Sequence, residues 1–374
     1  DFFIKQKRAY EIGVGLVGSE MCIRDSCGIA HIRTKNGRHV IIDGLSTAPY
    51  NATESMYEPI SDELPNYRDT VGRKNLLGPM SIAVPGALAG WCHALDQYGS
   101  WSLEDVIRPA IRLAEGGFVT TPYLTDCISD FQADLQKDAG LASIFLPNGQ
   151  PLSAGERLVQ SEYGQTLRSI ANYGAESLYG GELGDLLVNE LTRRDGLIDS
   201  KDLSCYKVLE REPIRGCYRG HEILGPPPPA SAGVHIVQML NILEGFDLAH
   251  MGYGTLDSVH LLAEVLQIAF ADRSVATADP AFIDVPVGRL IDKAYAEQSR
   301  QLIDMEQTRS WATGLNVSDS HSTTHVTVAD ARGNVVSSTQ TINGLFGACL
   351  DIPETALLIN NNMFNFDPHP NTAT

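Results

Sequence analysis

Hydroxyl-bearing side chains are concentrated in one segment near the end of the 374-residue chain, and they are the strongest candidates for chemistry. The segment reads His321-Ser-Thr-Thr-His-Val-Thr-Val-Ala-Asp330, passes through Ala331-Arg-Gly333, and continues Asn334-Val-Val-Ser-Ser-Thr-Gln-Thr-Ile-Asn343. A Thr or Ser hydroxyl becomes a nucleophile when a nearby base takes its proton. These residue types therefore indicate nucleophilic catalysis, provided that the fold brings two of them together.

The spacing of this segment predicts a β-hairpin. A three-residue loop with Gly333 in the left-handed conformation is a favoured connection, and it pairs Asp330 with Asn334. Counting back along both strands places Thr323 directly opposite Thr341, at roughly 4.5–5.5 Å between their Cβ atoms. We therefore expect one face of the hairpin to be rich in hydroxyl groups and the opposite, valine-rich face to be buried.

Two simpler interpretations stay open from the pattern alone. Thr is a good strand former, so its abundance can reflect strand propensity and no chemistry. His321 and His325 are four residues apart, a spacing that suits metal ligands on a helix, but on a strand it separates them by about 14 Å. We therefore predict no metal site, and we predict no cofactor.

Regular patterns elsewhere predict the elements that must hold this hairpin. Ile29–Ile32 and His39–Ile42, joined through Asn36-Gly37, predict a second hairpin with a type I′ turn. Residues 85–116 predict two helices, the second of which is capped by Ser102. Further helices are predicted at Val234–Leu243 and His260–Phe270.

Composition excludes two classes of partner. The chain carries 28 Lys+Arg against 46 Asp+Glu, a formal net charge of −18. Proteins that coat nucleic acid carry basic surfaces, so we expect no nucleic-acid partner. No run of 18 or more apolar residues occurs, so we expect no membrane insertion.

Residues 1–26 differ from the rest of the chain. They show no helical or strand period, and Val17-Gly-Ser-Glu-Met-Cys-Ile-Arg-Asp-Ser26 looks like a translated sequencing-adapter remnant of the kind seen in environmental gene assemblies. We therefore predict that residues 1–26 are not native. The alternative interpretation is an ordinary Gly-rich N-terminal loop.

Ordered motifs run from about residue 27 to about residue 366. They are Thr47-Ala48-Pro49, Val84-Pro-Gly86, Asp199 to Tyr206, Pro227 to Leu243, Ala269-Phe-Ala-Asp-Arg273, Thr323 to Asp330, Gly333-Asn334, Thr339-Gln-Thr-Ile-Asn343, Phe346-Gly347 and Leu358-Ile-Asn-Asn-Asn-Met363. In these motifs the chain resembles the gamma-glutamyltranspeptidase family. Because the matches are widely spread and in order, they are more specific than any single motif.

The resemblance implies an α/β (α+β) fold, the four-layer αββα sandwich of the N-terminal-nucleophile hydrolases, here incomplete. It also implies a precursor that cuts itself between Ser322 and Thr323. Residues 27–322 then correspond to part of the large subunit, and residues 323–374 to the start of the small subunit. We therefore expect a fragment truncated at both ends, inactive by itself, of a periplasmic or extracellular enzyme, with no signal peptide visible.

The resemblance also assigns roles to single residues. Thr323 corresponds to the nucleophile, which takes a γ-glutamyl group from glutathione or a related amide as an ester and passes it to water or to an amino acid or peptide amine. The α-amino group freed by the cut, with a reference pKa of about 7.7–8.0, is the expected base. Thr341 corresponds to a second Thr that hydrogen-bonds the nucleophile, and Asn343, Asn362 and Asn365 fall at substrate-binding positions.

Three departures from the family pattern affect the substrate. Leu45 stands where the family has an Arg that pairs with the substrate α-carboxylate, and Leu cannot make that bidentate contact. Asn365 replaces an Asp that meets the substrate ammonium, and Asn362 replaces a longer Gln or Glu. Gamma-glutamyl transfer or hydrolysis is the first prediction. An amidase or acylase with a non-glutamyl acyl group is the alternative, and an inactive fragment is the second alternative.

Overall fold

The computed structural model describes residues 27–276, 278–309 and 323–370. By their contacts these residues divide into two compact units. Most described residues before Arg211, together with residues 323–370, form the first unit. Residues 211–309 form the second unit, which also takes His39–Ile41. Both units combine helices with strands, so the predicted α/β class is confirmed.

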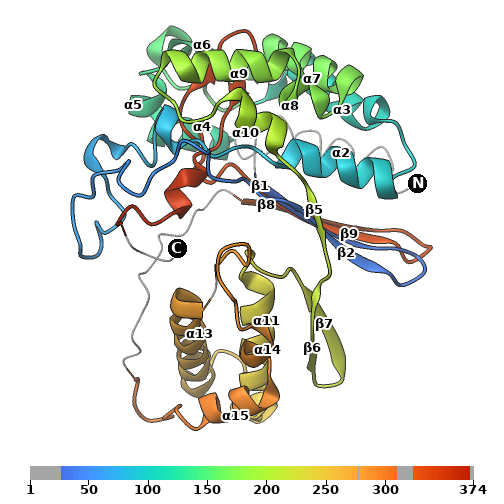
Figure 1. Ribbon diagram of the computed structural model, residues 1–374, viewed down its shortest axis with the longest axis vertical. Helices are drawn as coiled ribbons and strands as arrows, with labels where there is room; N and C mark the ends of the chain where they lie inside the picture. Colours follow the sequence, from blue (N-terminus) through green and yellow to red (C-terminus); the bar gives the residue numbers. More distant parts are fainter. Residues whose placement is uncertain (1–26, 277, 310–322, 371–374) are drawn as a thin grey trace. The chain divides into compact units, whose positions relative to one another are not determined.

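A five-stranded sheet, most of whose residues belong to the first unit, has the strand order β5-β2-β1-β9-β8 (Figure 1). Its strands are β1 (Cys27–Arg33), β2 (His39–Gly44), β5 (Leu209–Arg211), β8 (Thr323–Ala329) and β9 (Val335–Thr341). Strand β9 lies between β1 and β8 and runs antiparallel to both. The middle of the sheet therefore joins segments about 300 residues apart in the sequence.

The predicted hairpin of β1 and β2 is present, but its turn is not type I′. A type I′ turn needs a positive φ at both central residues. Gly37 has a φ of 83°, whereas Asn36 is not among the described residues with positive φ. The Gly37 N–H donates to the Thr34 carbonyl at 2.9 Å, so a longer loop with a single left-handed glycine makes the connection.

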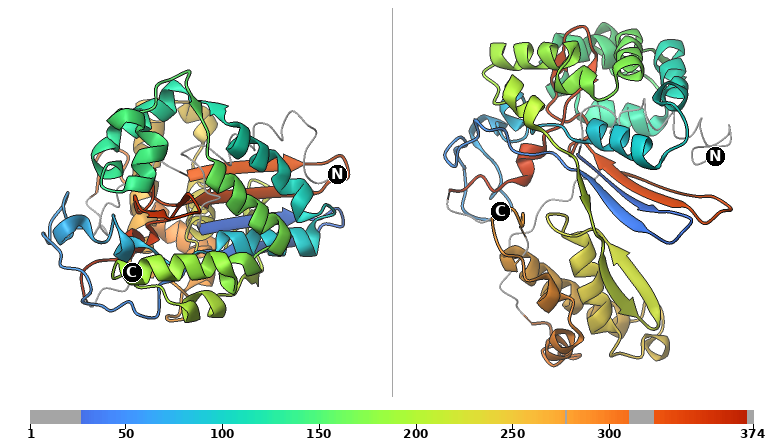
Figure 2. Two further views of the ribbon diagram at one scale, coloured as in Figure 1. Left: turned by 90° about the horizontal axis from the view of Figure 1, so that it is seen from above. Right: turned by 45° about the vertical axis from the view of Figure 1, so that its right-hand side comes forward.

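Helices of the first unit lie together on the same side of the sheet in the views of Figure 1 and Figure 2. They are α2 (Ala87–Tyr98), α3 (Leu103–Gly116), α4 (Pro122–Asp130), α5 (Gln132–Leu135), α6 (Ala139–Phe145), α7 (Ser161–Tyr173), α8 (Glu176–Tyr179), α9 (Glu182–Arg193) and α10 (Ser200–Cys205). The short elements between them are η1 (Val71–Arg73), η2 (Pro79–Ser81), η3 (Pro147–Gly149), β3 (Phe118–Val119) and β4 (Arg157–Leu158). As predicted, the Ser102 side chain caps α3 by accepting from the Asp105 N–H at 3.1 Å.

Apolar side chains from these helices form the main core, and the segment after β9 enters it. Phe346 is fully buried, and its ring meets that of Phe145 edge-on, with 5.2 Å between centroids. The chain then forms β10 (Asp351–Ile352), β11 (Leu357–Leu358) and η4 (Asn362–Asn365). Burial of an aromatic ring is strongly stabilising, so Phe346 anchors the residues that link β9 to η4.

The second unit has its own small core between helices. Its elements are β6 (Ile214–Tyr218), β7 (His221–Gly225), α11 (Ala232–Leu243), α12 (Leu248–Met251), α13 (Leu256–Ala276), α14 (Val287–Leu290) and α15 (Lys293–Arg300). Ile242, Leu261 and Val265 are buried in this core. The helices predicted at 234–243 and 260–270 are therefore confirmed as α11 and α13.

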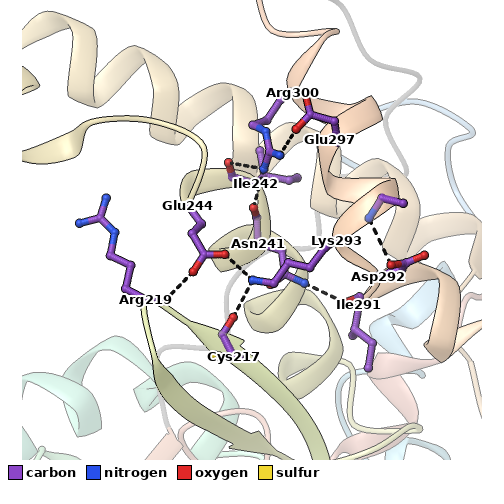
Figure 3. A network of polar contacts seen from close by, with 11 residues as sticks. Cys217, Arg219, Asn241, Ile242, Glu244, Ile291, Asp292, Lys293, Glu297 and Arg300 are labelled. Carbon is purple, nitrogen blue, oxygen red and sulfur yellow. Dashed lines mark hydrogen bonds and ion pairs between the residues drawn. The ribbon is translucent and has the colours of Figure 1, made fainter.

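Polar contacts fix the hairpin of β6 and β7 and the helix α15 to the end of α11 (Figure 3). The Lys293 ammonium donates to the Cys217 carbonyl at 2.7 Å and forms an ion pair with Glu244. The Arg300 guanidinium donates to the Asn241 carbonyl at 2.8 Å. Cations near a helix C-terminus satisfy its unpaired carbonyl groups and oppose its dipole. The polar contacts in Figure 3 thus link three parts of this unit, namely the hairpin of β6 and β7, the helix α15 and the C-terminal end of α11.

No helix among the described residues is both long and apolar enough to cross a membrane.

Helix α2 packs very closely on the end of β2, and glycine makes the approach possible. A Cβ atom on Gly86, just before α2, would lie 2.6 Å from the carbonyl oxygens of Gly44 and Leu45, and it would overlap the Tyr206 hydroxyl. Real Cβ atoms do not approach that closely, so any larger residue must move backbone. This contact fixes the path of the chain from β2 into residues 45 and 46.

We predict that Gly86→Ala lowers the free energy of unfolding by about 1–3 kcal/mol, the usual cost of overpacking. The measurement is urea denaturation of the complete gene product. Gly116→Ala is the matched control, because a Cβ at Gly116 meets nothing within 4 Å. If both variants unfold at the same urea concentration, close packing at Gly86 is not important for stability.

Candidate active site

The predicted register of the hairpin between β8 and β9 is confirmed. Thr323 is paired with Thr341, His325 with Thr339, and Thr327 with Ser337. The Asp330 N–H donates to the Asn334 carbonyl at 3.0 Å, and Gly333 has a φ of 87°. The left-handed glycine and the three-residue loop thus bring Thr323 and Thr341 face to face.

The hydroxyl-bearing face of this hairpin is exposed on β8 and already hydrogen-bonded. His325 Nδ1 lies 2.7 Å from Thr339 Oγ1, and His325 Nε2 lies 3.1 Å from both Thr327 Oγ1 and Ser337 Oγ. His325 therefore binds the neighbouring hydroxyl groups of the hairpin, two residues further along the face from Thr323. These hydrogen bonds link the two strands beside the candidate nucleophile.

The valine-rich face of the hairpin was expected to be buried, but it is less buried than predicted. Val326, Val328 and Val336 are only half-buried. Val326 and Val328 lie on β8, which is at the edge of the sheet among the described residues, whereas Val336 lies on the inner strand β9, so the edge position alone does not explain its exposure.

Asp330 closes the turn of the hairpin. Its carboxylate accepts from the backbone N–H groups of Arg332 and Asn334, both at 2.9 Å, and from Asn334 Nδ2 at 2.8 Å. Hydrogen bonds to the charged form of a carboxyl favour ionisation. Those from Asn334, with Arg332 adding to them, lower the pKa of Asp330 to about 2.

Thr341 is linked to the first of the predicted substrate-binding residues. The Asn343 N–H donates to Thr341 Oγ1 at 2.9 Å. Asn343 is buried with a φ of 75°, a left-handed conformation that Asn tolerates better than most residues. Its side chain donates to the Asn361 carbonyl at 3.2 Å. The turn after β9 therefore connects Thr341 directly to the segment of three asparagines.

Each of the three consecutive asparagines holds a different part of the site. Asn360 exchanges two hydrogen bonds with the Ala83 backbone, at 3.1 and 3.0 Å. Asn361 accepts from the Gly344 N–H at 2.8 Å. Asn362 Nδ2 donates to Ser46 Oγ at 2.7 Å. All three are nearly inaccessible to solvent, so they form a polar core beneath the site.

Leu45 lies next to this core, immediately after β2. Its N–H donates to the buried Asp43 carboxylate at 3.0 Å, and its carbonyl accepts from the Tyr206 hydroxyl at 2.8 Å. Burial, with Asp43 adding to it, raises the pKa of Tyr206, so this hydroxyl stays protonated and remains a donor. The backbone of Leu45 is thus fixed, and its side chain is half-buried.

Asn365 lies apart from the other predicted substrate-binding residues, exposed at the end of η4. Arg68 reaches this end of η4 and donates through Nη1 to the carbonyls of Phe364 and Asn365, at 3.0 and 3.3 Å. The structure therefore links Thr341 to Asn343, and Asn343 to the asparagine segment that contains Asn362, and it brings Asn365 to Arg68. Ser322, the residue predicted before the cut, lies outside the described residues.

Ser46 and Arg68 are the two residues of this region that the sequence patterns missed. Ser46 belongs to the motif Asp43-Gly-Leu-Ser-Thr-Ala-Pro49, in which it directly follows the unusual Leu45. Its position next to Leu45 is therefore the sequence signal that could have pointed to Ser46. Arg68 lies in a loop with no motif, so no sequence signal pointed to it. Within the described ranges, no group of three or more His, Cys, Asp or Glu is placed to hold a metal ion.

Comparison with known proteins identifies the family. A family model described as Gamma-glutamyltranspeptidase matches residues 26–374. This chain belongs to the gamma-glutamyltranspeptidase family. Individual relatives of known name are similar to it along most of its length. It is 61% identical over 346 residues to the Acylase ACY 1 proenzyme of Pseudomonas sp. (strain V22), a match that covers 92% of this chain and 62% of that relative.

A relative that is named for another activity is less similar to this chain. The chain is 36% identical over 348 residues to the Glutathione hydrolase proenzyme of Escherichia coli (strain K12), covering 92% of this chain and 59% of that relative. The chain thus spans less than two thirds of the length of these two curated relatives. Both are named as proenzymes.

Solved structures support the same family fold. The cephalosporin acylase from Bacillus halodurans matches with a TM-score of 0.83 and 28% identity, covering 98% of this chain and 66% of that chain. The gamma-glutamyltranspeptidase of Helicobacter pylori matches with a TM-score of 0.74 and 31% identity, covering 80% of this chain and 85% of that chain. These matches confirm the predicted mixed fold of the N-terminal-nucleophile hydrolase type.

We predict that Asp330 stabilises the hairpin only above acidic pH. Its pKa is lowered from about 3.9 in the unfolded chain to about 2 in the folded one. The stabilisation is therefore fully present above about pH 4 and is lost as the pH falls through about 2. The stability difference between the native protein and Asp330→Asn should shrink over that range.

Amide hydrogen exchange of residues 331–341, measured between pH 5 and pH 2, follows this change. Asp126→Asn, a substitution of an exposed residue of α4, is the control. A difference between native protein and Asp330→Asn that stays constant with pH would show that the charge of Asp330 does not hold the turn.

Proposed function

We propose that the complete protein is an autoprocessed amidase that transfers acyl groups through an ester on Thr323. The observation that carries the proposal is the pairing of Thr323 with Thr341 at directly opposed positions of β8 and β9. Family membership supports it, and so does the fact that both curated relatives are named as proenzymes. The exposed position of Thr323 leaves its hydroxyl accessible.

Processing is the first reaction in this proposal. Thr323 Oγ1 attacks the carbonyl carbon of residue 322, the C–N bond breaks, and the proton of the hydroxyl passes to the released amine. Water then hydrolyses the resulting ester, which leaves a carboxylate on residue 322 and a free hydroxyl and α-amino group on Thr323. The free amine titrates near pH 7.7–8.0 in reference peptides, so it is about half neutral at mildly basic pH and can act as a base.

Acyl transfer uses the same hydroxyl. The α-amino group takes the proton of Thr323 Oγ1 as the oxygen attacks the substrate amide, and it returns the proton to the amine that leaves. The acyl group remains on Thr323 as an ester until water or an acceptor amine removes it. Thr341, directly opposite, orients Oγ1, and Asn343 in turn holds Thr341 through a 2.9 Å hydrogen bond.

An acylase specificity is better supported than a γ-glutamyl specificity. Leu45 stands in place of the carboxylate-binding Arg, Asn365 in place of the ammonium-binding Asp, and neither carries a charge. The curated relative at 61% identity is named an acylase. The second candidate, glutathione hydrolysis or γ-glutamyl transfer, is favoured by Asn343 and Asn362 at substrate-binding positions and by the relative at 36% identity.

We predict that Thr323→Ala prevents both the chain cut and the hydrolysis of acyl anilides, because the attacking oxygen is lost. Thr323→Ser should retain both reactions at a reduced rate. The measurement is mass spectrometry of the complete gene product, with N-terminal sequencing of the smaller piece. Thr327→Val, on the same face of β8, is the control and should be cut normally. A native precursor that remains uncut would contradict the proposal.

We predict that Leu45→Arg raises the preference for γ-glutamyl anilide over a simple acyl anilide by about tenfold or more in kcat/KM. An Arg at this position can pair with the α-carboxylate, and hydrogen bonds to charged groups are worth roughly 1.5–3 kcal/mol. Leu45→Met is the control for a change of shape without charge. An unchanged preference would place the α-carboxylate away from residue 45.

A further inference from the structure

The cut proposed before Thr323 would turn the first residue of β8 into the end of a chain. In the part of the sheet that the structure describes, β8 is an edge strand with β9 as its neighbour. Chain termini are poorly ordered unless something ties them down. Thr341 can orient Thr323 only while the two residues stay paired. A contact that holds the beginning of β8 against β9 therefore bears directly on the nucleophile.

The two ends of the ladder between β8 and β9 are held unequally. At the turn, Gly333 and the hydrogen bonds of the Asp330 carboxylate fix the connection. Strand β9 is also paired with β1 on its other side, so its position does not depend on β8 alone. Thr323 is at the opposite end of seven paired positions. Fraying would therefore start at Thr323, and it would displace β8 and leave β9 in place.

His325 joins the two strands close to this end. It lies two residues from Thr323 on the same face, about 7 Å along the strand. Its Nδ1 lies 2.7 Å from Thr339 Oγ1, and its Nε2 lies 3.1 Å from Ser337 Oγ. Nε2 also lies 3.1 Å from Thr327 Oγ1 on its own strand. One ring thus contacts two residues of β9 that follow each other on the same face.

The hydroxyl partners suit a contact that holds two strands together. A hydroxyl can donate or accept, so it can match an imidazole nitrogen that does either. The network can therefore form whichever ring nitrogen carries the proton. His325 and Thr339 are exposed, so these contacts should add little to the stability of the whole fold. Their effect should fall mainly on the beginning of β8, where Thr323 is exposed and Thr324 is only half-buried.

We propose that His325 is a positioning residue, which keeps the new N-terminal residue Thr323 paired with Thr341 after the chain is cut. The inference rests on the proposed acyl transfer by Thr323. In the precursor, the peptide bond to residue 322 tethers the beginning of β8, so His325 matters little for the cut. In the mature protein that tether is gone, and His325 limits the fraction of molecules in which Thr323 has moved away from Thr341.

The test compares cutting with turnover in the complete gene product. His325→Leu removes both ring nitrogens and keeps an apolar side chain. The substrate is γ-glutamyl or hexanoyl p-nitroanilide, whichever the native protein hydrolyses faster. We expect the rate of cutting to stay within about twofold. We expect kcat to fall about fivefold with little change in KM, because the cross-strand contacts of one side chain are lost.

His325→Gln is the variant that should rescue turnover. Its amide supplies a donor and an acceptor but no group that can serve as a base near neutral pH. It should recover most of kcat, which a role of the imidazole in proton transfer would not allow. Thr339→Val removes one partner of the ring and should lower kcat by a smaller factor. His221→Leu, at the exposed first residue of β7, is the matched control and should change neither rate.

Amide hydrogen exchange gives a readout that does not depend on activity. In the mature protein, His325→Leu should speed exchange in residues 323–329. In the Thr323→Ala background the chain stays joined, and the same substitution should have a much smaller effect. Equal effects in both backgrounds would show that His325 supports the hairpin in general and has no particular role after the cut.

The outcomes separate this inference from the proposed function. Suppose that the native protein is cut and active. If His325→Leu then leaves kcat within twofold, or lowers cutting and turnover equally, the role of His325 is overturned and the acyl transfer stands. A kcat for His325→Gln as low as that for His325→Leu would overturn it too. If the native chain is not cut and neither anilide is hydrolysed, the proposed function fails and the inference fails with it.

Discussion

The pairing of β9 with two neighbours at once is the constraint on which the rest of the site depends. On one edge, Thr341 is paired with Thr323, and on the other edge it is paired with Cys27. A slip of one residue in a strand turns every side chain to the opposite face. Because β9 is held from both sides, such a slip would break two ladders together. The position of Thr341 opposite Thr323 is therefore set by the whole sheet, and the short turn alone does not have to define it.

Sequence patterns could predict this part of the site because its determinants are local. Gly333 and Asp330 specify the turn, and the register of Thr323 and Thr341 then follows by counting along two strands. The degree of burial was less predictable, since it depends on which other parts of the chain pack against each face of the sheet. Val326 and Val328 are half-buried for that reason, although their alternation with polar residues is regular.

Contacts between distant side chains could not be read from the sequence. The bond between Ser46 and Asn362 joins positions 316 apart, and Arg68 meets the backbone of η4 from a loop without a motif. Neither contact leaves a period or a spacing in the sequence. The resemblance to the family supplied the expected role of Asn362 but not its partner, because Ser46 belongs to the part of the motif in which this chain departs from the family.

The absence of charge at Leu45, Ser46 and Asn362 changes how a substrate can be recognised there. Charge-assisted hydrogen bonds are roughly twice as strong as neutral ones. The strength of a contact made by the neutral pair of Ser46 and Asn362 therefore depends more on shape and on desolvation than on long-range electrostatic attraction. Salt weakens exposed charge pairs by screening, but it should have little effect at these three residues because none of them is charged.

The ladder between β1 and β9 has a further meaning if the chain is cut before Thr323. The two strands would then belong to separate polypeptides, yet they would share seven paired positions within one sheet. The ladder between β1 and β9 would thus become part of the interface of a heterodimer. Unfolding of that dimer releases two chains, so refolding becomes a bimolecular event that depends on concentration. The covalent connection would be needed to form the sheet once, and afterwards the stability of the mature protein would be largely a matter of slow dissociation.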